Sequence, residues 1–172
     1  MRERATTSRR QTVLLTGHLL ATASWFGVGL AVTVLGFAGL IGSDPAVAYP
    51  AARILAAWLV APLAGLALAT GLLLVATTSW GLFTHRWVTA KLAITLVLAV
   101  AVAGLLIPRL GAVAAAVTGP DPSTPTVGQR LPLALAPAAA SVLLATNAAL
   151  AIAKPGGRRT PHDPRRPDGA DR

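Results

Sequence analysis

Cysteine is absent from this chain of 172 residues, and the only methionine is Met1. The absence of thiols excludes disulfides, zinc–thiolate sites and thiol catalysis. Charge is also scarce, because 12% of the residues are charged and 54% are hydrophobic, whereas a soluble domain has roughly 25% charged residues. A soluble fold of this size could not bury so much apolar surface. The composition therefore predicts an integral membrane protein.

Four long stretches carry almost no charge, and each exceeds or approaches the roughly 20 residues that cross a hydrocarbon core as a helix. We expect these transmembrane spans over residues 13–37, 54–77, 88–107 and 133–153. The predicted fold is thus all-α, an integral membrane four-helix bundle over residues 12–153. A basic segment over residues 1–11 precedes it, and a basic tail over residues 154–172, which has nothing apolar to bury, is predicted to be disordered.

Glycine and proline mark the expected boundaries. The sequence Gly42-Ser43-Asp44-Pro45 predicts a turn between the first two spans. Pro62 should bend the second helix, because proline lacks an N–H and its ring clashes with the preceding turn. Pro108 marks the end of the third span, or else that helix continues through the alanine-rich segment 111–118 with a kink. Residues 119–130 are predicted to form a loop in either case.

The basic start and the sequence Ala21-Thr22-Ala23 also resemble a secretory signal with its cleavage site. The apolar run continues through Val34, however, well past the roughly 7 to 15 residues of a signal core. An uncleaved first helix is therefore the preferred interpretation.

The basic residues predict the orientation. With both termini in the cytoplasm, 12 of the 15 Lys and Arg residues lie inside, and Arg53, Arg109 and Arg130 lie outside. This asymmetry follows the positive-inside rule. Trp80 and Trp87 would then lie at the cytoplasmic interface and Tyr49 near the outer one, whereas Trp25 and Trp58 lie deeper and pack between helices or face lipid. The heavy use of Ala, Arg, Gly and Pro suggests a bacterium, and hence a multi-pass protein of its inner cell membrane.

His18 is the only ionisable residue well inside a predicted span, and such a residue is a functional candidate by default. Helical spacing places it on the same face as Trp25 and Gly29, so we expect it to face the bundle. Its functional interpretation is a proton relay or a ligand for haem or metal. Its structural interpretation is a neutral imidazole bonded to a backbone or threonine partner. Lys91, at the start of the third span, either approaches His18 or extends to lipid phosphate.

No second histidine lies at membrane depth, and a copper site would lack Cys and internal Met. We therefore expect no bound cofactor, with haem or copper at His18 as the alternative. Small residues recur on the first and second spans and favour close helix packing; they are Gly27, Ala31, Gly36 and Gly39, then Gly65, Ala69 and Gly71.

One set of short motifs suggests a family. His18 is followed by Trp25-Phe26-Gly27, then by Thr70-Gly71-Leu72-Leu73-Leu74, and finally by Trp80-Gly81 and Trp87 with Lys91. This arrangement over about residues 12–110 resembles predicted bacterial integral membrane proteins of unknown function. It is also distantly similar to the membrane domain of copper-resistance D proteins. The resemblance implies a four-helix membrane fold and carries no established activity.

The net charge of +9 does not indicate nucleic-acid binding, because most of the charge lies in two tails and one loop. That distribution fits anionic lipid headgroups better. No phosphate-binding loop, Ser-His-Asp set or pair of carboxylates is visible. The sequence thus predicts a non-enzymatic membrane subunit or small transport-related protein, whose partners are the bilayer and other membrane subunits or further copies of itself. The alternative is a haem- or copper-handling protein that uses His18.

Overall fold

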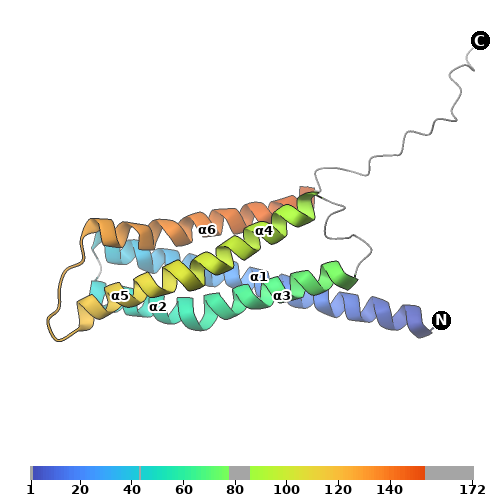
Figure 1. The fold of residues 1–172 in the computed structure, drawn as a ribbon, viewed down its shortest axis with the longest axis horizontal. Helices are drawn as coiled ribbons and strands as arrows, with labels where there is room; N and C mark the ends of the chain where they lie inside the picture. Colours follow the sequence, from blue (N-terminus) through green and yellow to red (C-terminus); the bar gives the residue numbers. More distant parts are fainter. Residues whose placement is uncertain (1, 43, 78–85, 154–172) are drawn as a thin grey trace, which may run out of the picture.

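The computed structural model describes residues 2–42, 44–77 and 86–153, and its side chains over 9–42, 44–77 and 88–149. The described chain is all-helical, and its elements form four antiparallel rods (Figure 1). They are α1 (Arg2–Ile41), α2 (Pro45–Leu55) with η1 (Ala56–Val60) and α3 (Ala61–Thr77), α4 (Arg86–Ala101) with η2 (Val102–Leu106) and α5 (Ile107–Thr118), and α6 (Val127–Ala153).

The α1–α2 turn and the α5–α6 connection lie together at one end of the bundle, here called the loop end (Figure 1). The start of α1 and the end of α6 lie at the opposite end, here called the terminal end. Each rod is long and apolar enough to cross a membrane, and the four candidate spans are Arg9–Ile41, Pro45–Thr77, Val88–Thr118 and Val127–Ala149. The prediction of four apolar helices in an all-α fold is therefore confirmed.

A wide helical turn precedes each of two prolines. Pro62 follows the π-helical turn η1, and Pro108 follows the π-helical turn η2. In each case the residue before the proline donates its N–H to the carbonyl five positions back, from Ala61 to Ala56 and from Ile107 to Val102. The wide turn makes room for a proline ring that a regular turn would clash with. The third rod thus continues past Pro108, as the alternative prediction had it.

The predicted turn after the first helix is confirmed. Gly42 has a φ of +147°, a backbone conformation that glycine adopts readily and residues with a Cβ rarely do. Asp44 then caps α2, because its Oδ1 accepts from the N–H of Ala46 at 2.9 Å, and Pro45 occupies the first turn, where its missing N–H costs nothing.

The predicted loop over residues 119–130 is too long by four residues. α6 begins at Val127 because Thr126 and Gln129 form a capping box, in which the Thr126 N–H donates to Gln129 Oε1 at 2.9 Å. Arg130 is therefore helical, and its Nη1 donates to the Gly39 carbonyl of α1 at 3.4 Å.

The helices also extend beyond the spans drawn from the charge pattern. Arg53 was placed before the second span, but it lies in the third turn of a helix that begins at Pro45. Arg109 was placed at the exit of the third span, but it lies inside α5. Tyr49, which was expected near the outer interface, has its side chain fully buried against Gly39 of α1.

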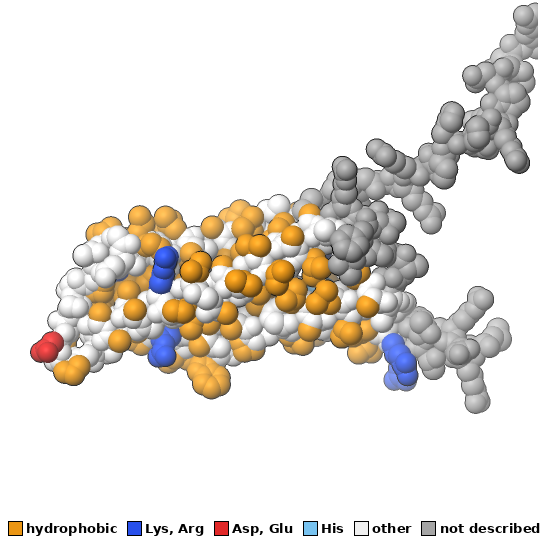
Figure 2. All heavy atoms as spheres, in the orientation of Figure 1, with side chains coloured by type: hydrophobic (Ala, Val, Ile, Leu, Met, Phe, Trp, Pro, Cys, Tyr) orange, Lys and Arg blue, Asp and Glu red, His pale blue; other side chains and the backbone are white. Residues whose placement is uncertain are grey.

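The core follows one side of each rod and is made of small and aliphatic side chains. It includes Ala52, Ala56 and Ala64 on the second rod, Leu110 on the third and Leu133 on the fourth. Outside the core, large apolar side chains are exposed along all four rods. Trp58, 76% exposed, is the bulkiest of them, and Figure 2 shows that such side chains cover the middle of the bundle while the charged ones lie toward its ends.

Candidate functional site

His18 forms a polar contact between two helices. Its ring is half-buried, and Nδ1 lies 3.0 Å from Oγ1 of Thr70 on α3. Gly71 allows this approach, since a Cβ there would lie 3.3 Å from the imidazole Cε1. The prediction that His18 faces the bundle is therefore confirmed.

The hydroxyl of Thr70 lies between His18 and its own helix. Its Oγ1 donates to the Leu66 carbonyl at 2.7 Å and lies 3.0 Å from His18 Nδ1. The tautomer of the ring sets the roles in this contact. In the tautomer protonated at Nδ1, that N–H donates to Thr70 Oγ1, and Nε2 keeps a lone pair that could serve as a ligand.

Lys91 lies near His18 at the terminal end of the bundle. It is half-buried on α4, and its ammonium is within range of an electrostatic interaction with the ring. Because α4 runs away from the terminal end, its side chains tilt toward that end. Lys91 therefore lies beside His18 while its side chain extends toward the terminal end of the bundle.

Asn147 is a buried polar residue that sequence reasoning missed. It is 8% exposed, and its Nδ2 donates to Oγ1 of Thr95 on α4 at 3.4 Å. Its Oδ1 is buried without a hydrogen-bond partner among the described residues. Thr95 in turn donates to the Lys91 carbonyl. The available signal was a single amide among the residues of the fourth span, and it was missed because asparagine does not ionise.

Two polar contacts thus link helices in the terminal half of the bundle, one between α1 and α3 and one between α4 and α6. Lys91 lies near both. We call His18, Thr70, Lys91, Thr95 and Asn147 the polar cluster. Among the described side chains, no group of three His, Cys, Asp or Glu residues could hold a metal ion.

The remaining predicted residues lie in different surroundings. Trp25 is 2% exposed and packs inside the bundle. Gly27 faces outward, with nothing within 4 Å of a Cβ placed there, whereas Gly36 lies against the α6 backbone. Trp87 belongs to α4, but its side chain lies outside the described residues, as do Trp80 and the predicted tail 154–172.

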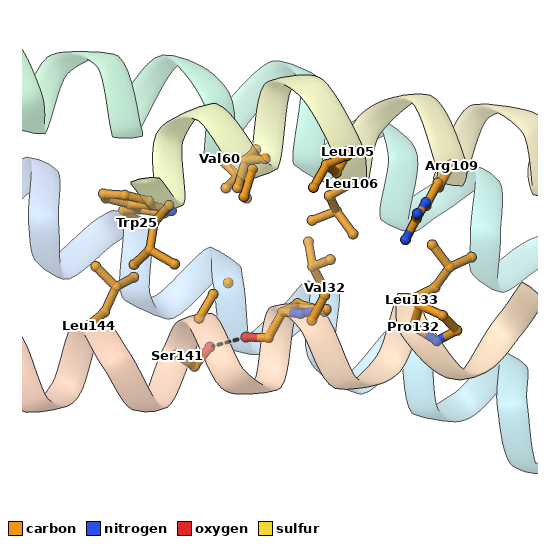
Figure 3. Close-up of a pocket in the computed structure, with 17 residues that line it drawn as sticks. Trp25, Val32, Val60, Leu105, Leu106, Arg109, Pro132, Leu133, Ser141 and Leu144 are labelled. Atoms are coloured by element: carbon orange, nitrogen blue, oxygen red, sulfur yellow. Dashed lines mark hydrogen bonds between the residues drawn. The ribbon is translucent and has the colours of Figure 1, made fainter. Parts of the chain in front are cut away.

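A cavity of about 130 Å³ lies near the middle of the bundle. It is bounded by α1, by α4, η2 and α5, and by α6, and Val60 of η1 closes it from the second rod (Figure 3). Trp25 and Val32 contribute from α1, and Ser141 contributes from α6, where its hydroxyl donates to the Pro137 carbonyl. Apart from Ser141 and Trp25, the only polar side chain of the lining is Arg109.

Arg109 and Arg53 lie at one level near the loop end. Arg53 Nε would be 3.3 Å from a Cβ at Gly111, two residues beyond Arg109. Lys91 and Arg109 are about 18 residues apart on one rod, which at a 1.5 Å rise per residue corresponds to roughly 27 Å. Four ionisable side chains of the spans therefore lie at two levels, His18 with Lys91 and Arg53 with Arg109.

Comparison with known protein families, curated proteins and solved structures gave no match for this chain. The resemblance to copper-resistance D membrane domains accordingly stays a prediction. Conclusions about function must rest on the geometry alone.

Proposed function

We propose that this chain is a non-enzymatic, multi-pass protein of a bacterial inner membrane, acting as a membrane subunit or small transport-related protein. The observation that carries the membrane assignment is the separation of the two ionisable levels. Roughly 27 Å of helix between Lys91 and Arg109 is close to the ~30 Å thickness of a hydrocarbon core. The large side chains exposed between these levels are apolar, including Leu66, Leu96 and Leu135.

The polar cluster supports a packing role over a catalytic one. The Thr70 hydroxyl is bonded to its own helix and to His18, so it is not a free nucleophile. The amide of Asn147 bridges two helices. In lipid, such contacts between helices contribute about 0.6 kcal/mol on average, so each adds modestly to the packing of neighbouring helices.

Single-cysteine labelling tests the membrane assignment, because the native chain offers a background without cysteine. Leu66→Cys and Leu96→Cys place thiols on the exposed apolar surface between the two levels, and Ser123→Cys places one in the α5–α6 connection. A membrane-impermeant maleimide should label Ser123→Cys and leave the other two unlabelled until detergent unfolds the protein. Labelling of Leu96→Cys in intact membranes at the rate of Ser123→Cys would refute the assignment.

Ser123→Cys and a further variant, Arg9→Cys, test the orientation. With both termini in the cytoplasm, Ser123→Cys should react in intact cells, whereas Arg9→Cys should react only in inside-out vesicles. The reverse pattern would place the termini outside.

A second candidate function is the handling of haem or copper, favoured by the imidazole of His18, whose Nε2 carries a lone pair in the tautomer protonated at Nδ1. Haem would find one axial ligand there. Purified protein with a Soret band or stoichiometric copper that His18→Ala abolishes would support this function over the first. Thr70→Ala is the matched control, since it removes the partner of Nδ1 and leaves the imidazole in place.

A further inference from the structure

The cavity is elongated along the bundle and opens on the outer surface. Its lining runs from Leu144 to Pro132 on α6, about 12 residues and roughly 18 Å of helix. Leu105 and Ala136 on its rim are exposed, so the cavity is a crevice between α4–η2–α5 and α6. The stretch of α6 that lines it is comparable to the ~15 Å of hydrocarbon in one leaflet.

Arg109 lies at the loop end of this crevice without a partner. It makes no hydrogen bond or ion pair with another described residue, and neither Asp44 nor Asp121, the two acids among the described side chains, lines the cavity. In Figure 3 its guanidinium points from α5 toward Pro132 and Leu133 of α6. The direction follows from the helix: α5 runs toward the loop end, so its side chains tilt back toward the middle of the bundle.

Arg53 provides a contrast at the same level. It belongs to a rod that runs the other way, so its side chain tilts toward the loop end, and it does not line the cavity. The guanidinium of Arg109 therefore overhangs an apolar crevice, whereas that of Arg53 does not.

We propose that the crevice binds one acyl chain of an anionic phospholipid, with the headgroup phosphate on the guanidinium of Arg109. A guanidinium can bind two phosphate oxygens at once, and the wall of aliphatic and small side chains below it fits a hydrocarbon chain. The crevice runs parallel to the helices, which is the direction of lipid tails in a leaflet. This inference rests on the proposed membrane insertion.

Fluorescence quenching of two tryptophans tests the site. Trp25 forms part of the crevice wall, whereas the exposed Trp58 reports the bulk lipid. Two single-tryptophan proteins, each with the other three tryptophans changed to phenylalanine, are reconstituted in phosphatidylcholine with a minor fraction of phosphatidylglycerol whose acyl chains are brominated. Trp58 should be quenched according to the mole fraction of brominated lipid, and Trp25 more strongly. Brominated phosphatidylcholine at the same fraction should quench Trp25 less.

Four variants of the Trp25 protein then locate the lipid. Arg109→Gln should lower the preference of the site for phosphatidylglycerol over phosphatidylcholine about fivefold, as expected for one basic residue near a headgroup. Ala136→Leu, on the crevice rim, should reduce quenching by both lipids. Arg53→Gln and Ala139→Leu, an exposed alanine of α6 outside the crevice, are the controls and should change neither.

The outcomes separate the two proposals. If Trp58 is quenched as expected but Trp25 shows no excess quenching by brominated phosphatidylglycerol, the lipid site is wrong and membrane insertion stands. Equal effects of Arg109→Gln and Arg53→Gln would also overturn the site. If Trp58 is not quenched, the chain does not expose this surface to lipid, and both proposals fail.

Discussion

Replacing Gly36 by alanine should push α1 and α6 apart. A Cβ at this position would lie 2.5 Å from the Leu133 carbonyl oxygen and 2.9 Å from Cα of Ala134. Both are backbone atoms, so no side chain can rotate away to relieve the contact. The helices would have to separate by about 0.9 Å to reach an ordinary 3.4 Å contact.

The size of the effect follows from the packing that this separation weakens. A radial gap of about 0.5–1 Å forfeits a quarter to a half of each dispersion contact, and overpacking a core typically costs 1–3 kcal/mol. Because α1 and α6 pack along much of their length, we expect Gly36→Ala to lower the free energy of unfolding by about 2–3 kcal/mol.

Gly27→Ala is the matched control. It makes the same chemical change on the same helix, where nothing lies within 4 Å of the new methyl group. Its effect should be neutral or stabilising by up to about 1 kcal/mol, because alanine favours a helix over glycine. Unfolding by SDS titration of mixed micelles, followed by circular dichroism, measures both. Equal stability of the two variants would show that α1 and α6 do not meet as described.

Three further predictions concern the polar cluster. Thr70→Ala should lower the free energy of unfolding by about 1 kcal/mol, because the contact with His18 is lost. Thr22→Ala is the control and should cost less, because the Thr22 hydroxyl bonds only to its own helix. Equal stability of the two variants in the same SDS titration would contradict the described role of Thr70. Gly71→Ala should displace the imidazole of His18 by a few tenths of an ångström. Nuclear magnetic resonance would report this as a change in the His18 ring resonances, and unchanged resonances would refute the close approach. Asn147→Leu should leave stability unchanged or raise it, because Oδ1 is already unpaired and Thr95 keeps its bond to the Lys91 carbonyl. Asn147→Asp should instead cost about 1–3 kcal/mol, because it loses the Nδ2 donor and buries a carboxyl group; equal stability of these two variants would contradict the burial of residue 147.

The number of helices could be predicted from the sequence because charge is so expensive in hydrocarbon that it marks the spans. The ends of the helices could not. A basic residue such as Arg53 was taken as the start of a helix, but that helix begins at Pro45. Its first turns need no membrane-length apolar run, because contacts such as Tyr49 against Gly39 stabilise them. The start of α6 could have been predicted from the capping box of Thr126 and Gln129, but the prolines around it favoured a loop.

The candidate site was predicted in part. The face of His18 followed from helical spacing, and its threonine partner was anticipated by type. Its identity as Thr70 depends on how α1 packs against α3, which one sequence does not specify. Small residues were informative only as a group, because Gly36 and Gly71 make close contacts while Gly27 and Gly65 face outward. The crevice beside Arg109 has no counterpart in the sequence pattern at all.

The two π-helical turns change how the sequence of this bundle maps onto its faces. Core residues on the third rod recur at every fourth position, as Leu98, Val102, Leu106, Leu110 and Ala114. In a regular helix such a row drifts around the axis by about 40° at each step, so its two ends would lie on nearly opposite sides. The π-helical turn η2 has more residues per turn, so it offsets part of this rotation and keeps these core residues facing inward. Removing one residue from Val102–Leu106 would therefore rotate everything beyond it, and the guanidinium that overhangs the crevice would swing out of reach.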